Sequence, residues 1–252
     1  MAIKLKNTIA KLKHFITFSV YSGYDWVNIS QENHMNYSEA LSFTFQDEQW
    51  AKKIAIGGLF TFIAVFSGIL FFFGFLALGY YIGVLRNVMS GESKPLPEWK
   101  NWGKFLADGL LGCIIFLIYF LVIGGITALL IVQVATEPGF QDFERVLLIV
   151  SISLVALFSL TILTNIGLVQ FAATNDFGAA FNLAEIFRSL RNDFANYLTI
   201  VIFSAILNCI LFLVGIAIFS PFTNFWGLVV QAHLFGQSAK SVHEPSAVVQ
   251  SV

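Results

Sequence analysis

Charge is what this sequence has least of. Only 12% of its 252 residues are Asp, Glu, Lys or Arg, against about a quarter in ordinary soluble domains, whereas 57% are hydrophobic. A water-soluble fold cannot hide that much apolar surface. The net charge of −1 also leaves no basic field on the molecule, so nucleic acid is excluded as an expected partner.

Cysteine and catalytic motifs are scarce as well. The two cysteines, Cys113 and Cys209, lie inside apolar runs, where a small buried hydrophobe is the expected role. The four histidines do not cluster, and no HExxH, CxxC, GxSxG or Walker pattern occurs. We therefore expect no metal, no cofactor and no enzymatic activity. The basic N-terminus lacks the apolar core of a cleavable signal peptide, so none is expected.

Long uncharged runs take the place of the missing charge. Each exceeds the length of about 18 residues at which an apolar run is interpreted as a membrane span, and they cover residues 54–85, 109–136, 146–175 and 198–232. Pro221 divides the last run into a span over 198–219 and a shorter helix over 222–236, because proline disfavours helix before it. The expected fold is all-α: a polytopic membrane bundle of about six membrane helices, with amphipathic helices at the cytoplasmic interface.

The first run, 54–85, is too long for one simple span. As a single helix it would measure about 48 Å, against a hydrocarbon core of about 30 Å. It either tilts or turns back near Ser67 as a hairpin of two short helices. A single helix divides the Lys and Arg residues seven to seven between the two sides, whereas a hairpin places 13 of the 14 on one side and only Arg145 opposite. Basic residues gather on the cytoplasmic side, so we predict the hairpin, with both termini cytoplasmic and the chain in the cell (inner) membrane.

Three regions are expected along the chain. Residues 1–34 form an N-terminal extension that suits either an amphipathic surface helix or a frayed basic tail, and Met35 offers a second start. Residues 35–240 form a single membrane domain, and 241–252 a disordered tail. Sequence matches at an offset of 87 predict a weak internal repeat between about 70–130 and 157–217.

A polar segment, SGESKPLPEWKNWGKFLADG at 90–109, joins two of the apolar runs and is expected at the cytoplasmic interface. Its two prolines end the preceding helix, and Glu98 is expected in the first turn of the next, where an acid suits the helix dipole. Trp99 and Trp102 are expected in the interfacial belt that tryptophan favours. The segment 175–198 has a similar amphipathic design.

Polar groups in or beside the apolar runs are candidates for function, because lipid makes them costly. Asn165 and Asn208 lie at similar depths and are expected to meet, either as a structural amide pair or as part of a solute site. Asp108 has no obvious neighbouring base and is interpreted as a solvated interface acid. Structural roles are expected for the remaining candidates, which are Gly79 and Gly83 in close helix packing and His233 and Gln237 at the end of the last apolar piece.

Three phrases of the sequence occur together in order. They are FQDEQWAKKIAIGGL at 45–59, LGYYIGVLRNVMSGESKPLPEW with NWGKFLADGL at 78–110, and VVQAHLFGQ at 229–237. They resemble the signature blocks of a bacterial and archaeal membrane family catalogued as domain of unknown function 4013. The resemblance covers about 35–240 and implies a multi-helix membrane module with no established activity. Where that family often has a proline in the first apolar run, this chain has Ser67 and Gly68.

The sequence therefore favours a non-enzymatic membrane module that acts as a scaffold, an assembly partner or a lipid-interacting protein. The alternative is a transporter or permease for a small, weakly polar solute, motivated by the repeat and by Asn165 and Asn208. The expected partners are the lipid bilayer and, beyond it, other membrane proteins or a second copy of the chain.

Overall fold

The computed structural model describes residues 35–67, 72–215 and 219–243, so the predictions for residues 1–34 and for the tail from 244 lie outside the described residues. The chain divides into two compact units, Met1–Met35 and Asn36–Val252, and the described helices all belong to the second. No strand occurs in the described part of the chain. The all-α prediction is confirmed, with these elements: α2 (Tyr37–Ser42), η1 (Phe43–Gln46), α3 (Trp50–Ser67), α4 (Phe73–Met89), α5 (Trp102–Thr136), α6 (Asp142–Thr174), η2 (Gly178–Phe181), α7 (Leu183–Gly215) and α8 (Ser220–His243).

The first apolar run, 54–85, forms two helices, as predicted. Helix α3 ends at Ser67 and α4 begins at Phe73. The two helices pack against each other, and the rings of Phe60 and Phe73 stack with their centroids 5.5 Å apart. Helix α4 ends where Gly91 adopts a φ of +70°, a left-handed conformation that lets the backbone satisfy the last carbonyl groups of the helix.

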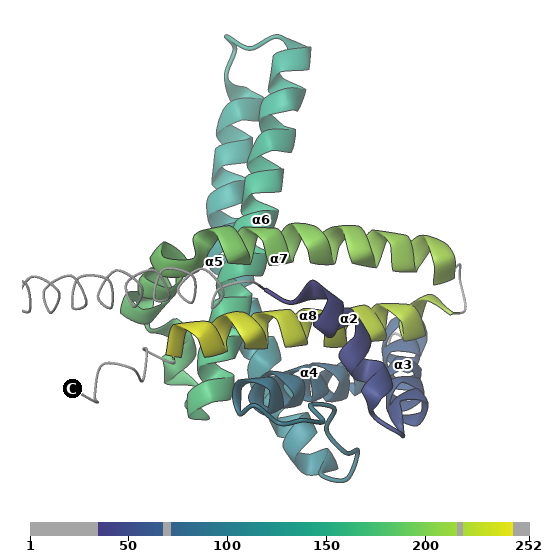
Figure 1. Ribbon diagram of the computed structural model, residues 1–252. Helices are drawn as coiled ribbons and strands as arrows, with labels where there is room; N and C mark the ends of the chain where they lie inside the picture. Colours follow the sequence, from purple (N-terminus) through teal and green to yellow (C-terminus); the bar gives the residue numbers. More distant parts are fainter. Residues whose placement is uncertain (1–34, 68–71, 216–218, 244–252) are drawn as a thin grey trace, which may run out of the picture. The chain divides into compact units, whose positions relative to one another are not determined.

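A second hairpin consists of the two longest helices, α5 and α6, which lie side by side and reach their connecting turn beyond the other labelled helices (Figure 1). Helix α6 begins with a capping box in which the side chains of Gln141 and Glu144 each bond the other's backbone N–H. It ends at Asn175, whose φ of 55° is left-handed. The apolar runs predicted at 109–136 and 146–175 are thus helices.

The outer part of the α5–α6 hairpin is apolar and exposed. Among its exposed side chains are Phe116, Leu121, Leu129, Val132, Phe143, Val146, Val155 and Leu157. Water-soluble proteins rarely expose a contiguous apolar surface of this extent, whereas it is the expected outer surface of a helix in lipid. By length and composition, α3, α5, α6 and α7 are each long and apolar enough to cross a membrane.

Helix α7 merges two segments that the sequence separated. The part of the amphipathic segment from Leu183 onward and the predicted span as far as Gly215 share one helix, interrupted by a non-helical residue at Asp193 (φ −136°, ψ 24°). Tyr197, in the first half of α7, lies 6.0 Å from Phe235, in the second half of α8, between ring centroids. Figure 1 shows α7 and α8 side by side and running across the α5–α6 hairpin.

The last helix, α8, is more than the short piece predicted at 222–236. It begins at Ser220, with Pro221 in its first turn, where a missing N–H leaves no bond unmade. It packs against α3, α4 and α7, and its buried side chains form the core of the unit: Phe225, Val229, Val230, Ala232, Leu234, Phe235 and Ala239. The ring of Phe225 fits against α3 because position 57 there is glycine.

Candidate functional site

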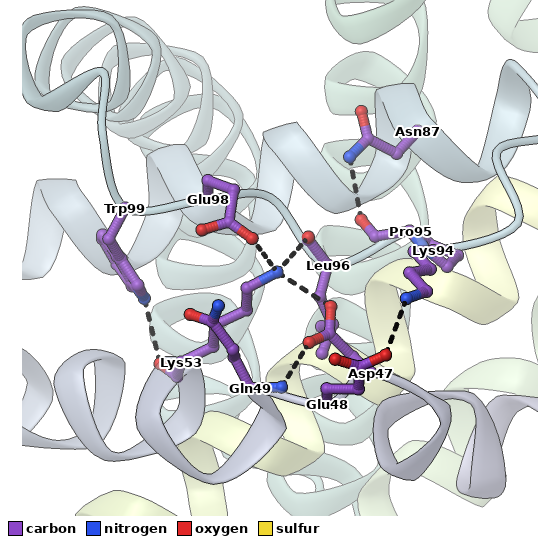
Figure 2. Close-up of polar contacts among 10 residues, drawn as sticks. All are labelled: Asp47, Glu48, Gln49, Lys53, Asn87, Lys94, Pro95, Leu96, Glu98 and Trp99. Carbon is purple, nitrogen blue, oxygen red and sulfur yellow. Dashed lines mark hydrogen bonds and ion pairs between the residues drawn. The ribbon is translucent and has the colours of Figure 1, made fainter.

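A buried lysine of α3 contacts the polar linker between α4 and α5. Lys53, near the start of α3, has only 5% of its side chain exposed. Its ammonium meets three acceptors, as Figure 2 shows: Asp47 Oδ2 at 2.8 Å, Glu98 Oε1 at 2.7 Å and the Leu96 carbonyl oxygen at 3.0 Å. An ammonium has three N–H donors, so this one is fully satisfied within the protein.

Trp99 completes this group, which we call the linker cluster: Asp47, Lys53, Leu96, Glu98 and Trp99. The indole N–H of Trp99 donates to the backbone carbonyl of Lys53 at 3.0 Å, and its ring stacks on Tyr80 with centroids 4.5 Å apart. Trp99 is only 9% exposed, so it is a core residue rather than part of an interfacial belt. Trp102, at 43% exposed, does lie at the surface.

The linker cluster brings the two ends of the first apolar run together. Glu98 does not lie in the first turn of the next helix, as the sequence suggested, because α5 begins only at Trp102. It lies in the linker instead and reaches back to the start of α3. Asn87 Nδ2 donates to the carbonyl of Pro95 at 2.9 Å and holds the linker to the end of α4 (Figure 2). The run therefore turns back on itself.

The two carboxylates of the linker cluster are held in their charged form. Burial raises the pKa of Asp47, but the hydrogen bonds from Lys53 and from the backbone N–H of Gln49 outweigh burial, so this pKa lies below its ordinary value. The hydrogen bond from Lys53 likewise lowers the pKa of the half-exposed Glu98. Neither carboxyl group has a proton to donate near neutral pH, which suits a structural ion pair better than acid catalysis.

A second ion pair fastens α4, α5 and α6 together. Both terminal nitrogens of Arg86 donate to the carboxylate of Asp108, with Nη2 to Oδ1 at 3.2 Å. Arg86 Nε donates to the carbonyl of Ala172 at 3.3 Å, and the guanidinium lies 5.6 Å from the ring centre of Phe171. The interpretation of Asp108 as a solvated acid is wrong, because this side chain is buried and paired. Its partner is on another helix, which the sequence could not reveal.

The two asparagines of the apolar runs do not pair with each other. Asn165 accepts from the hydroxyl of Tyr81 and donates to the carbonyl of Thr161 at 2.7 Å. Asn208 donates to the carbonyl of Ser204 at 2.8 Å. The expectation that they meet is therefore wrong, since each amide bonds its own surroundings.

The two candidate glycines, Gly79 and Gly83 of α4, lie where the linker and α5 come closest. A Cβ at Gly79 would overlap the backbone carbonyl of Phe105. A Cβ at Gly83 would fall 2.9 Å from the ring of Pro97. Neither position leaves room for a side chain, so both glycines allow close packing of the backbone.

The two candidates on α8 contact the N-terminal end of the described unit. His233 is buried and stacks on the ring of Phe43, with centroids 4.1 Å apart. Gln237 accepts a hydrogen bond from the backbone N–H of Asn36 at 3.2 Å. These contacts join α8 to the segment that precedes α3.

The candidate residues chosen from the sequence do not include Lys53. A signal was present, since Lys53 shares the buried face of α3 with Ile54 and Gly57. Within the described residues, no group of three or more His, Cys, Asp or Glu side chains could hold a metal ion. The linker cluster and the Arg86–Asp108 ion pair hold the helices and the linker together.

Comparison with known protein families gives a match. A family model described as "Protein of unknown function (DUF4013)" matches residues 62–220. This region contains the C-terminal third of α3, all of α4 to α7 and the polar linker. A search of curated proteins and a search of solved structures each found no match.

Proposed function

Because the chain belongs to the family described as protein of unknown function DUF4013, we propose that it is an integral membrane protein without enzymatic activity, acting as a scaffold, assembly or lipid-interacting module. One observation carries the proposal. The outer part of the α5–α6 hairpin exposes many apolar side chains, among them Leu129 and Phe143. Removing such a surface from water is favourable by about 25 cal/mol per Å², and a bilayer is the solvent that does so.

The charged side chains support the non-enzymatic part of the proposal. Lys53 and Arg86 have the most buried side chains among the described lysines and arginines. Both donate their hydrogen bonds to other groups of the protein. Such ion pairs join separate segments of the chain, which is a structural role. Asn165 and Asn208 were one of two motives for transport as an alternative, but they bond separately, so that alternative now rests on the predicted internal repeat alone.

The proposed orientation places both termini and the linker cluster on the cytoplasmic side of the cell membrane. Its support is that Lys53 and Glu98 bring the start of α3 and the linker together, as expected if the basic connections share one side of the membrane. The turn of the α5–α6 hairpin, with Arg145 and its acidic neighbour Asp142, lies at the other end of those helices.

Two measurements on the full chain test this proposal. Alkaline carbonate should leave the protein in the membrane pellet, and its release into the supernatant would refute membrane integration. In a variant without native cysteines, Gly139→Cys in the hairpin turn should react with an impermeant maleimide on intact cells. Ser93→Cys in the linker should react only after permeabilisation, and labelling of this position from outside would reverse the orientation.

A further inference from the structure

An apolar groove lies in the elbow where α7 crosses α6. It has a volume of about 570 Å³ and is lined by α6 residues between Ser151 and Leu163 and by Leu190, Phe194 and Leu198 of α7. The hydroxyl of Ser151 donates to its own helix, to the Leu147 carbonyl at 2.7 Å, so it does not make the wall polar. The volume lies within the range of about 300–1,000 Å³ that is usual for small-molecule sites.

The charge beside this groove is positive and uncompensated. Arg191 is exposed and lies on α7 between the lining residues Leu190 and Phe194. Arg188 is paired with Glu185 at 2.9 Å, whereas Arg191 has no ion-pair partner in the part of the chain that the structure describes. An apolar groove with one free cation at its edge is complementary to an acyl chain that carries an anionic headgroup.

The depth of the elbow agrees with a lipid ligand. From the groove residue Ile162 back to the start of α6 at Asp142, the helix runs about 20 residues, or about 30 Å, which equals the thickness of the hydrocarbon core. With the hairpin turn at one membrane surface, the elbow falls at the other. That is the depth at which a phospholipid changes from acyl chain to phosphate.

We infer that the α6–α7 groove binds one anionic phospholipid, with an acyl chain along α6 and the headgroup phosphate on Arg191. This inference rests on the proposed membrane function and gives it a ligand. The long stem of arginine lies along apolar surface while its guanidinium reaches the phosphate. The groove then prefers anionic over zwitterionic headgroups and has little selectivity for the acyl chain.

Native mass spectrometry of the detergent-purified full chain, loaded with phosphatidylglycerol or phosphatidylcholine, tests the inference. The wild-type protein should retain one phosphatidylglycerol in preference to phosphatidylcholine. Arg191→Gln should reduce this preference by about fivefold, the factor for one basic side chain near an anionic surface. Arg191→Lys should keep most of the preference, and Arg145→Gln, on the hairpin turn, should keep all of it. An unchanged preference in Arg191→Gln would overturn the headgroup assignment.

A matched pair of tryptophan variants tests the groove itself. Leu147 and Leu154 lie two turns apart on α6 and are each 50% exposed, but only Leu154 lines the groove. Leu154→Trp should lower the retention of both lipids, whereas Leu147→Trp should match the wild type. Equal retention by the two variants would overturn the groove. A wild-type dimer that Leu154→Trp converts to a monomer would assign the groove to a second copy and overturn lipid binding.

The outcomes separate this inference from the proposed function. Release of the wild-type chain by alkaline carbonate contradicts the membrane function, whatever the groove variants do. If the wild-type chain stays in the pellet while Leu154→Trp behaves like Leu147→Trp, only the lipid site fails. Thermal unfolding in detergent checks that both variants are folded before their lipid retention is compared.

Discussion

Replacing Lys53 by methionine tests the linker cluster most directly. Methionine keeps the volume and the apolar stem but removes the ammonium that Asp47, Glu98 and the Leu96 carbonyl share. Asp47 is buried and would keep only the backbone N–H of Gln49. Breaking a buried ion pair from one side costs about 3–5 kcal/mol. Because Glu98 is half-exposed and regains water, we expect the lower end, about 3 kcal/mol.

A double variant separates the cost of the unpaired carboxylate from the loss of packing. Asp47→Asn combined with Lys53→Met leaves no buried charge and preserves an acceptor for the N–H of Gln49. We expect it to recover about 2 kcal/mol relative to Lys53→Met alone, within the range for coupled neighbours. Glu98→Gln alone should cost less than about 1 kcal/mol, as for other exposed ion pairs.

The assay is reversible unfolding in mixed detergent micelles, followed by tryptophan fluorescence. Trp99 serves as the probe because it belongs to the linker cluster and donates a hydrogen bond to the Lys53 carbonyl. Lys52→Met is the matched control, because this neighbouring lysine is exposed, and its change should stay within about 0.5 kcal/mol. Equal stability of Lys52→Met and Lys53→Met, or no recovery in the double variant, would refute the reasoning.

Three further predictions concern pH, packing and the second ion pair. The folded pKa of Asp47 lies below the unfolded value of about 3.9, so its stabilising contribution is complete above that value and is lost as pH falls through the folded pKa. The free energy of unfolding should therefore fall less with decreasing pH in the Asp47→Asn, Lys53→Met variant than in the wild type. Equal pH profiles of the two proteins would contradict this. Gly79→Ala should lower the free energy of unfolding by about 1–3 kcal/mol through overpacking. Gly124→Ala, with nothing within 4 Å of the new methyl group, should not lower it. Equal unfolding midpoints of the two variants would contradict the close approach at Gly79. Arg86→Met should cost about 3 kcal/mol by leaving Asp108 buried and unpaired, and adding Asp108→Asn should restore most of it; a double variant no more stable than Arg86→Met would show that the pair is not coupled.

The sequence alone determined the helical class and most of the helices, because lipid-length apolar runs and backbone hydrogen-bond saturation permit few other structures. The balance of basic residues also predicted that the run 54–85 turns back, which depends on charge rather than on any contact. The helix ends were predicted less well, since the prolines were expected to end the helix before the linker, whereas α4 already ends at Met89, before Gly91 with its positive φ. The predicted internal repeat and the regions outside the described residues stay predictions.

Only the tertiary structure decided which polar residues meet. Lys53 finds Glu98 across a separation of 45 residues, and Arg86 finds Asp108 on the neighbouring helix. Hydropathy reads each segment separately, so it placed Trp99 in the interface and Asp108 in water, although both are buried. Whether a side chain is buried depends on which helix packs over it, and that helix often comes from a distant part of the chain. Helix α8 is the main example, because no local sequence pattern predicts its central position.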